Sequence, residues 1–168
     1  KKLQTFKEWH KIGYVPQRAS LLDASFPATV LDIVKMGRIA HKTIFNRFND
    51  EDVAIVNDAM KTMGVFDLQR QRVMIARALA SKPEVLILDE PNTGVDMVSQ
   101  KSFYELLRVL NRELGITIIF ITHDIGVIAD DITTLITINQ KATICNNPKQ
   151  TLSCKDMSEL YGVNAHLL

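Results

Sequence analysis

Apolar residues along this chain form short continuous runs, separated by longer stretches in which they recur at helical spacing. The runs "EVLILD" and "TIIFITHD" are partly β-branched, which is typical of strands covered on both faces of a sheet. We therefore expect 85–88 and 118–121 to be neighbouring parallel strands that are buried on both faces. A further short strand is predicted in "KIGYVPQ" (11–17), where Pro16 ends it.

Helical periodicity appears in the segments between these strands. It covers residues 28–38, 50–65, 70–83 and 98–115. Asp50 is the expected N-cap of the second helix, Gly64 its end, and Gly115 the residue that closes the last helix. A strand, an amphipathic helix and another strand of these lengths form a βαβ unit, so the pattern predicts an α/β fold.

Composition narrows the function classes only slightly. With 168 residues, 46% of them hydrophobic, the chain can bury one core, and a net charge of +1 without charge runs does not indicate a nucleic-acid surface. No apolar run approaches the roughly 20 residues that cross a bilayer. Cys145 and Cys154 lack a paired spacing and are interpreted as incidental thiols of a reducing compartment.

Polar groups end both central strands, as "DE" and "THD". The carboxyl edge of a parallel sheet is where ligands bind. One carboxylate of Asp89 and Glu90 can hold the magnesium ion of a nucleotide, and the other can orient or deprotonate an attacking water. Taken alone, the pair can equally be a turn followed by a helix cap.

Four motifs in one order then indicate a family. "VLILDEP" with "NTGVD" and, after a helix, "IIFITHD" resembles the Walker B segment, D-loop and switch histidine of ABC-type ATPases. "YVPQ" resembles their Q-loop segment, and "RQRVMIARALASKP" resembles the helix after their signature sequence. The resemblance implies a P-loop NTPase-like core with a mostly parallel sheet and a helical subdomain.

The resemblance also implies roles for individual residues. Asp89 would bind magnesium through its water shell together with Gln17, and Glu90 would act on the water that attacks the γ-phosphate of ATP. His123 would hydrogen-bond the γ-phosphate, and Asp96 would cross a dimer interface to the opposite nucleotide. Without the family context, a lone histidine is usually structural and an aspartate near a helix start is a cap.

Two family motifs do not occur in the sequence. It contains no GxxxxGK[ST] phosphate loop and no LSGGQ-type signature, and "GVFDLQ" runs directly into "RQRVMIARAL". We expect the chain to be the ordered part of a longer protein, with a gap near Leu68, Gln69 and Arg70 whose flanks are poorly ordered without nucleotide. The alternative is a truly truncated protein.

The implied domain plan is a partial ABC ATPase domain over the whole chain. Residues 1–27 would be core with the Q-loop, and 28–80 a helical subdomain interrupted near 68–70. Residues 81–168 would be core with Walker B, the D-loop, the switch histidine and a C-terminal segment.

Within the family, "KIGYVPQRA", "FPATVLDIVKMGR" and "NRELGITIIFITHDIGVIADDI" are similar to the ATPase subunits of bacterial zinc and manganese importers. This implies an ATP- and Mg²⁺-dependent ATPase, cytoplasmic and peripheral on the inner face of the membrane. Its partners would be a second copy of itself, a membrane permease and, indirectly, a metal-binding solute-binding protein, with no nucleic acid. Alternatives are the ATPase of a siderophore or haem importer, a non-transport ABC protein, and a catalytically dead truncated module.

Overall fold

The computed structural model describes residues 6–17, 28–41, 48–64, 70–91, 97–122, 132–146 and 148. The chain divides into two compact units, 1–123 and 124–168. Of the residues at the predicted gap, Leu68 and Gln69 lie outside the described residues, so the gap stays a prediction. No helix in the described ranges is long and apolar enough to cross a membrane.

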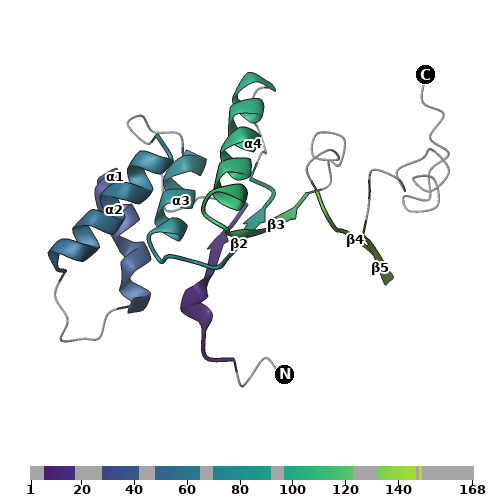
Figure 1. Cartoon of the computed structure of the whole chain (residues 1–168), viewed down its shortest axis with the longest axis horizontal. Coiled ribbons are helices and arrows are strands. Elements are labelled where there is room, and N and C mark those ends of the chain that lie inside the picture. Colours follow the sequence, from purple (N-terminus) through teal and green to yellow (C-terminus); the bar gives the residue numbers. More distant parts are fainter. Residues whose placement is uncertain are drawn as a thin grey trace. The chain divides into compact units, whose positions relative to one another are not determined.

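A three-stranded parallel sheet forms the centre of the first unit (Figure 1). Its order is β1 (Ile12–Val15), β2 (Val85–Asp89) and β3 (Thr117–Ile121). The register joins Tyr14 to Ile87 and Asp89 to Ile121. The predicted parallel pairing of the two apolar runs is therefore confirmed.

One face of this sheet is closed by helices. Because side chains alternate along a strand, Gly13, Leu86 and Phe120 lie on the same face. A Cβ placed on Gly13 would contact Ala78 of helix α3, and the ring of Tyr104 from helix α4 lies 5.9 Å from that of Phe120. Both helices thus cover one face, where Leu86 and Leu88 are fully buried.

The opposite face of the sheet is open, and here the expectation of burial on both faces is wrong. Ile119 and Ile121 of β3 are 47% and 48% exposed, and Tyr14 of β1 is 51% exposed. The physical reason is that α3 and α4 both pack on the other side, so no described helix of this unit covers these side chains. A continuous apolar run showed that the strand is apolar on both faces, but not what lies against each face.

Two short helices follow β1 in the chain. Helix α1 (Val30–Lys35) begins with a capping box, in which Thr29 and Asp32 satisfy each other's backbone N–H groups. It continues as the 3-10 helix η4 (Met36–His41). A Cβ on Gly37 would collide with the carbonyl oxygen of Arg77, so only glycine permits this close approach of η4 to α3.

Helix α2 (Asp50–Thr62) begins one residue earlier than predicted, because Asn49 and not Asp50 is its N-cap. The Asn49 side chain accepts a hydrogen bond from the Asp52 N–H, and the Asp52 carboxylate accepts one from the Asn49 N–H, so a capping box decides the start. The predicted end is confirmed, since Gly64 has a φ of +59° in the left-handed region that favours glycine.

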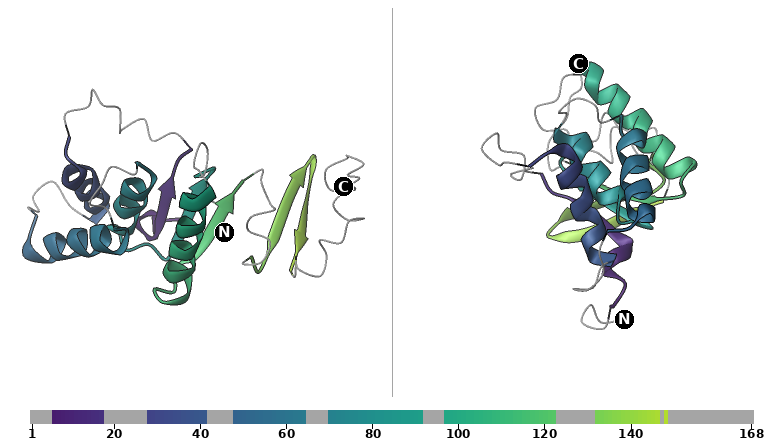
Figure 2. Two further views of the ribbon diagram at one scale, coloured as in Figure 1. Left: turned by 90° about the horizontal axis from the view of Figure 1, so that it is seen from above. Right: turned by 90° about the vertical axis from the view of Figure 1, so that its left-hand side faces the viewer.

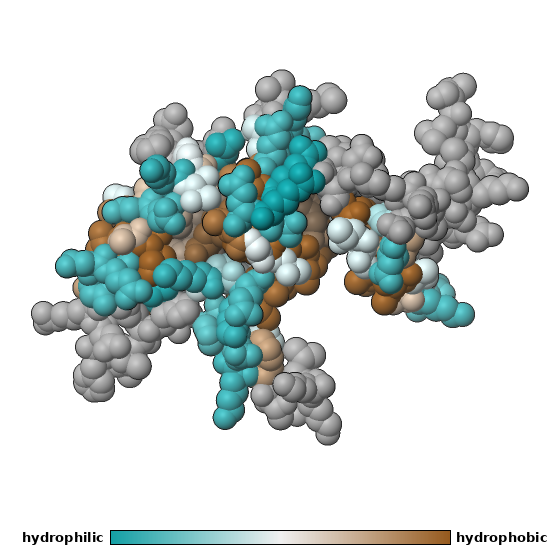
Figure 3. Space-filling model, in the orientation of Figure 1, coloured by the Kyte–Doolittle hydropathy of each residue, from teal (hydrophilic) through white to brown (hydrophobic). Residues whose placement is uncertain are grey.

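The remaining helices occur in the predicted segments but end earlier, at Leu79 instead of residue 83 and at Arg112 instead of residue 115. Helix α3 (Arg70–Leu79) precedes β2, and α4 (Met97–Arg112) connects β2 to β3. After α4 the chain turns at Gly115, whose φ is +67°. Figure 2 shows α1, α2 and α3 packed against one another, while Figure 3 shows a largely hydrophilic surface over α4.

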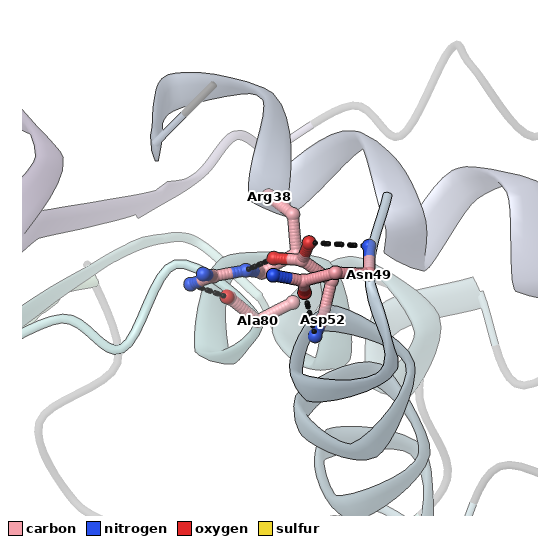
Figure 4. Close-up of polar contacts among 4 residues, drawn as sticks. All are labelled: Arg38, Asn49, Asp52 and Ala80. Atoms are coloured by element: carbon pink, nitrogen blue, oxygen red, sulfur yellow. Dashed lines mark hydrogen bonds and ion pairs between the residues drawn. The ribbon is translucent and has the colours of Figure 1, made fainter. Parts of the chain in front are cut away.

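A buried ion pair joins three of these elements (Figure 4). Arg38 of η4 donates from Nε to the Asp52 carboxylate of α2 at 3.0 Å and from Nη1 to the carbonyl oxygen of Ala80 at 3.2 Å. Both charged side chains are buried, so the polar groups satisfy one another inside the helical layer.

The second unit contains a hairpin of β4 (Leu135–Asn139) and β5 (Lys141–Cys145). The strands are antiparallel, and the turn between them holds Gln140 at a φ of +55°.

Candidate active site

Adjacent carboxylates lie at the carboxyl edge of the parallel sheet. Asp89 is the last residue of β2, and Glu90 follows it directly. Gln17 comes two residues after the end of β1, the neighbouring strand. Because parallel strands end at one edge, this arrangement collects polar groups from different parts of the sequence in one place.

The first carboxylate is held by a tyrosine of the neighbouring strand. Tyr14 pairs with Ile87, so Asp89 lies two residues further along β2 on the same open face. The Tyr14 hydroxyl donates a hydrogen bond to Asp89 Oδ2 at 3.0 Å. This hydrogen bond raises the pKa of the Tyr14 phenol above its usual value, because loss of the proton would place two negative charges together.

The second carboxylate is held by the glutamine after β1. Gln17 donates from Nε2 to Glu90 Oε2 at 2.5 Å. An amide that donates through its nitrogen to one group keeps its carbonyl oxygen as an acceptor for another ligand. The Gln17 side chain can therefore contact Glu90 through its nitrogen and a bound ligand through its oxygen.

The backbone of Glu90 is constrained as well. Its N–H donates to the carbonyl oxygen of Ile121 at 2.9 Å, which extends the β2–β3 pairing by one residue. Its φ of +44° lies in the left-handed region, which costs a residue with a side chain about 1 kcal/mol or more. Such strain is concentrated at functional sites, where the surrounding structure enforces it.

The donor set fits a magnesium ion carried by a nucleotide. Mg²⁺ prefers oxygen ligands and usually binds through one or two carboxylates, with water and phosphate oxygens completing its shell. Asp89 Oδ1 and the side-chain oxygen of Gln17 are possible metal ligands of this kind at the carboxyl edge of the sheet. Glu90, already bonded to Gln17, is the neighbouring carboxylate that can accept a proton from water.

Of the residues predicted from the sequence, the structure brings Gln17, Asp89 and Glu90 together. Asp96 and His123 lie outside the described residues, so their roles stay predictions. Tyr14 was missed. Its only sequence signal was its place in "YVPQ", and recognising its contact with Asp89 required the strand register.

A groove lies away from this site. It has a volume of about 630 Å³ and runs between α2 and the residues that precede β2 and β3, among them Lys82, Pro83 and Ile116. These residues mark the amino ends of the strands, so the groove is at the opposite edge of the sheet from Asp89 and Glu90.

Comparison with known families gives two matches. The family described as ABC transporter matches residues 4–93, which contain the site at the sheet edge. The family described as "AAA domain, putative AbiEii toxin, Type IV TA system" matches residues 71–129. The two overlap on the segment from α3 through the adjacent carboxylates.

Three curated proteins show extended sequence similarity. The zinc uptake system ATP-binding protein ZurA of Listeria innocua is 40% identical over 147 residues, 81% of this chain and 57% of that protein. The high-affinity zinc uptake system ATP-binding protein ZnuC of Bacillus subtilis is 42% identical over 67% of this chain and 54% of its own length. The manganese transport system ATP-binding protein MntB of Halalkalibacterium halodurans is 39% identical over 69% and 50%. The chain thus spans about half the length of the curated relatives it matches.

Solved structures agree with the sequence matches. A metal-chelate type ABC transporter in an inward-facing conformation superposes with a TM-score of 0.81 at 27% identity, over 91% of this chain and 64% of that one. A dimeric bacterial ABC transporter cassette gives a TM-score of 0.57 at 29% identity, over 70% and 54%. The chain has the ABC ATPase fold, and it belongs to the family of ABC transporter ATP-binding proteins.

Proposed function

We propose that this chain is part of the ATP-binding and ATP-hydrolysing subunit of an importer for divalent metal ions, either zinc or manganese. The observation that carries the proposal is the pair Asp89 and Glu90, each held by a hydrogen bond donor from β1 or its end. The metal cargo is supported by the names of the relatives, which are zinc and manganese transport proteins.

Each residue of the site has a proposed part. Asp89 and Gln17 would hold the magnesium ion of Mg-ATP, which when bound neutralises charge on the phosphates. Glu90 would orient and deprotonate the attacking water, and its hydrogen bond with Gln17 would keep it at that position. His123 would donate to the γ-phosphate, and Asp96 would contribute to the opposite site across a dimer interface.

Gln17 is also the proposed sensor of nucleotide state. It follows β1 and precedes the helical segment that begins with α1, so a shift of its side chain can be passed to those helices. This agrees with the proposed domain plan, in which 28–80 is a helical subdomain between core segments 1–27 and 81–168.

The proposed partners are a second copy, which would sandwich ATP, and a membrane permease that receives the closing movement. A metal-binding solute-binding protein would act indirectly through the permease. The dimeric cassette among the structural relatives supports the first partner. The proposed location is the cytoplasmic face of the cell membrane. The chain by itself would not hydrolyse ATP, because its sequence has no phosphate-loop motif.

The test is Glu90→Gln in the complete transporter. We expect ATP affinity to be kept while hydrolysis falls by about two orders of magnitude, because the amide cannot accept a proton from water. In the isolated full-length ATPase subunit with the same substitution, the sandwich dimer should accumulate with ATP, which light scattering would detect as a doubling of mass. Asp89→Asn is the comparison variant, and it should weaken Mg-ATP binding as well as turnover. Hydrolysis by Glu90→Gln at the wild-type rate would remove Glu90 from the mechanism.

A further inference from the structure

Tyr14 has a position that packing among the described residues does not explain. Its neighbours in β1, Gly13 and Val15, are buried against the helical side of the sheet, whereas the Tyr14 ring lies on the open face and is 51% exposed. Against the described residues, a half-exposed ring buries little apolar area, so its contribution to this part of the core is small. The specific contact that it makes is polar, through the hydroxyl to Asp89.

The register of the sheet aims this hydroxyl at one oxygen of the carboxylate. Tyr14 is paired with Ile87, and the phenol reaches along the face to Oδ2 of Asp89. A carboxylate at a strand end can rotate about two side-chain bonds, and a donor fixed on the adjacent strand selects one orientation. Oδ1 is then left for a cation or its bound water.

We propose that Tyr14 is a positioning residue that holds the Asp89 carboxylate in the orientation that receives magnesium. The inference rests on the proposed function, and it deepens it by separating two tasks. Tyr14 acts on the metal-binding carboxylate, whereas Gln17 contacts the carboxylate that acts on water. Groups that hydrogen-bond a metal ligand typically change metal affinity when removed.

This division predicts which kinetic quantity changes. Loss of the Tyr14 hydroxyl frees Asp89 but leaves the Gln17–Glu90 contact, so the step in which water attacks is affected less than metal binding. A residue with a merely structural role would instead lower the melting temperature, without a selective change in magnesium dependence.

The experiment uses Tyr14→Phe in the complete transporter, because this variant removes only the hydroxyl. We expect the Mg²⁺ concentration that half-saturates hydrolysis to rise about tenfold, the lower end of the usual range for such contacts because this site is exposed. Turnover at saturating Mg²⁺ should fall by less than about threefold. In the full-length ATPase subunit without the permease, ADP-dependent binding of Mn²⁺, measured by electron paramagnetic resonance, should weaken by a similar factor of about ten.

Two further variants make the result specific. Ile119→Ala changes the same open face without removing a hydrogen bond and should bind Mn²⁺ like the wild type. In an Asp89→Asn background, Tyr14→Phe should weaken Mn²⁺ binding little further, because the carboxylate that Tyr14 positions is gone.

The outcomes separate this inference from the proposed function. If the wild type binds Mn²⁺ with ADP and Tyr14→Phe binds it within twofold, the positioning role is wrong while the proposed function stands. The positioning role would also be wrong if the effects of Tyr14→Phe and Asp89→Asn on Mn²⁺ binding were fully additive. If the wild-type ATPase subunit does not bind Mn²⁺ together with ADP, the proposed function itself fails.

Discussion

Two regions of this molecule use aspartate in opposite ways. In the helical layer Asp52 is 1% exposed and receives hydrogen bonds from Arg38 and from the backbone of Asn49 (Figure 4). At the sheet edge Asp89 is partly exposed and receives a hydrogen bond from the Tyr14 hydroxyl. The two aspartates have the same chemistry and different surroundings.

The difference shows how the environment assigns a task to a charged group. A buried carboxylate needs a charged partner and further donors, because desolvation of an unpaired ion costs several kcal/mol. Asp52 has both a charged partner and a further donor, so its carboxylate oxygens accept their hydrogen bonds from groups inside the fold. Asp89 is only partly buried, and the hydrogen bond from Tyr14 reaches its Oδ2 atom, which is compatible with the proposed metal-binding role.

The largest expected effect comes from breaking the buried pair. Asp52→Ala leaves the Arg38 guanidinium buried without its counter-ion, and we expect the free energy of unfolding to fall by about 3–5 kcal/mol. Urea denaturation of the full protein would measure it. The matched control is Asp50→Ala, an exposed acid in the same first turn of α2, which should cost less than about 1 kcal/mol.

Replacing both partners sharpens this result. Arg38→Met with Asp52→Leu removes the charges together, so most of the loss seen with Asp52→Ala should be recovered. Equal losses for Asp50→Ala and Asp52→Ala would show that the buried pair has no special weight in stability.

A smaller effect is expected at the sheet edge. Asp89→Asn keeps an acceptor for Tyr14 and creates no buried charge, so the free energy of unfolding should change by less than about 1 kcal/mol. Asp52→Asn is the matched substitution and should cost several times more, because it leaves Arg38 uncompensated. If Asp89→Asn and Asp52→Asn lowered the free energy of unfolding by similar amounts, the two regions would not differ in how they depend on aspartate.

An exposed capping carboxylate tests a third environment. The Thr29 hydroxyl donates to Asp32 Oδ2 at 2.6 Å and its N–H donates to the same oxygen, and these bonds lower the pKa of Asp32. Thr29→Ala should raise this pKa toward its usual value, with Thr29→Ser as the control that retains the hydroxyl. Carboxyl-carbon NMR titration would measure both.

The sign of the pH effect follows from the lowered pKa. A carboxylate with a depressed folded-state pKa stabilises the fold above its unfolded-state pKa, and the contribution is lost as pH falls through the folded value. In the wild type, the contribution of Asp32 to the free energy of unfolding should therefore be lost progressively as the pH falls below about 4. The same pH dependence in Thr29→Ala would contradict the assigned cause.

The smallest effect is expected for an ion pair in solvent. Lys11 Nζ lies 2.9 Å from Glu8 and 3.0 Å from Glu84, but Lys11 is partly exposed and both glutamates are exposed. Lys11→Met should not shift the urea midpoint measurably, because exposed pairs are screened by water and salt. A shift comparable to that of Asp52→Ala would show that burial does not separate these ion pairs.

Much of the fold followed from local patterns. Apolar runs predicted β2 and β3, and Gly64 and Gly115 marked the ends of helices because each adopts a positive φ. The N-cap of α2 was misplaced by one residue, since Asp50 and Asn49 are both good caps and only the contact with Asp52 distinguishes them. The open face of β3 was missed because its apolar side chains carry no information about what covers them.

The candidate site could be predicted in type but not in its contacts. The sequence indicated Asp89 and Glu90 at a strand end and Gln17 after another strand. The pairing of Gln17 with Glu90 and the contact of Tyr14 with Asp89 span 73 and 75 positions of the chain. Such contacts depend on strand register, which no local pattern near either residue specifies.

The sequence by itself determined the α/β character, the glycine turns after α2 and α4, the family motifs and the adjacent carboxylates, because each depends on residues that are neighbours along the chain. Tertiary structure decided which face of β3 stays open, which donor meets each carboxylate, and that Arg38 and Asp52 form a closed buried pair. The physical reason is that hydrogen bonding and desolvation act between groups in space. Two aspartates that look alike in sequence acquire different tasks only when the fold gives them different neighbours.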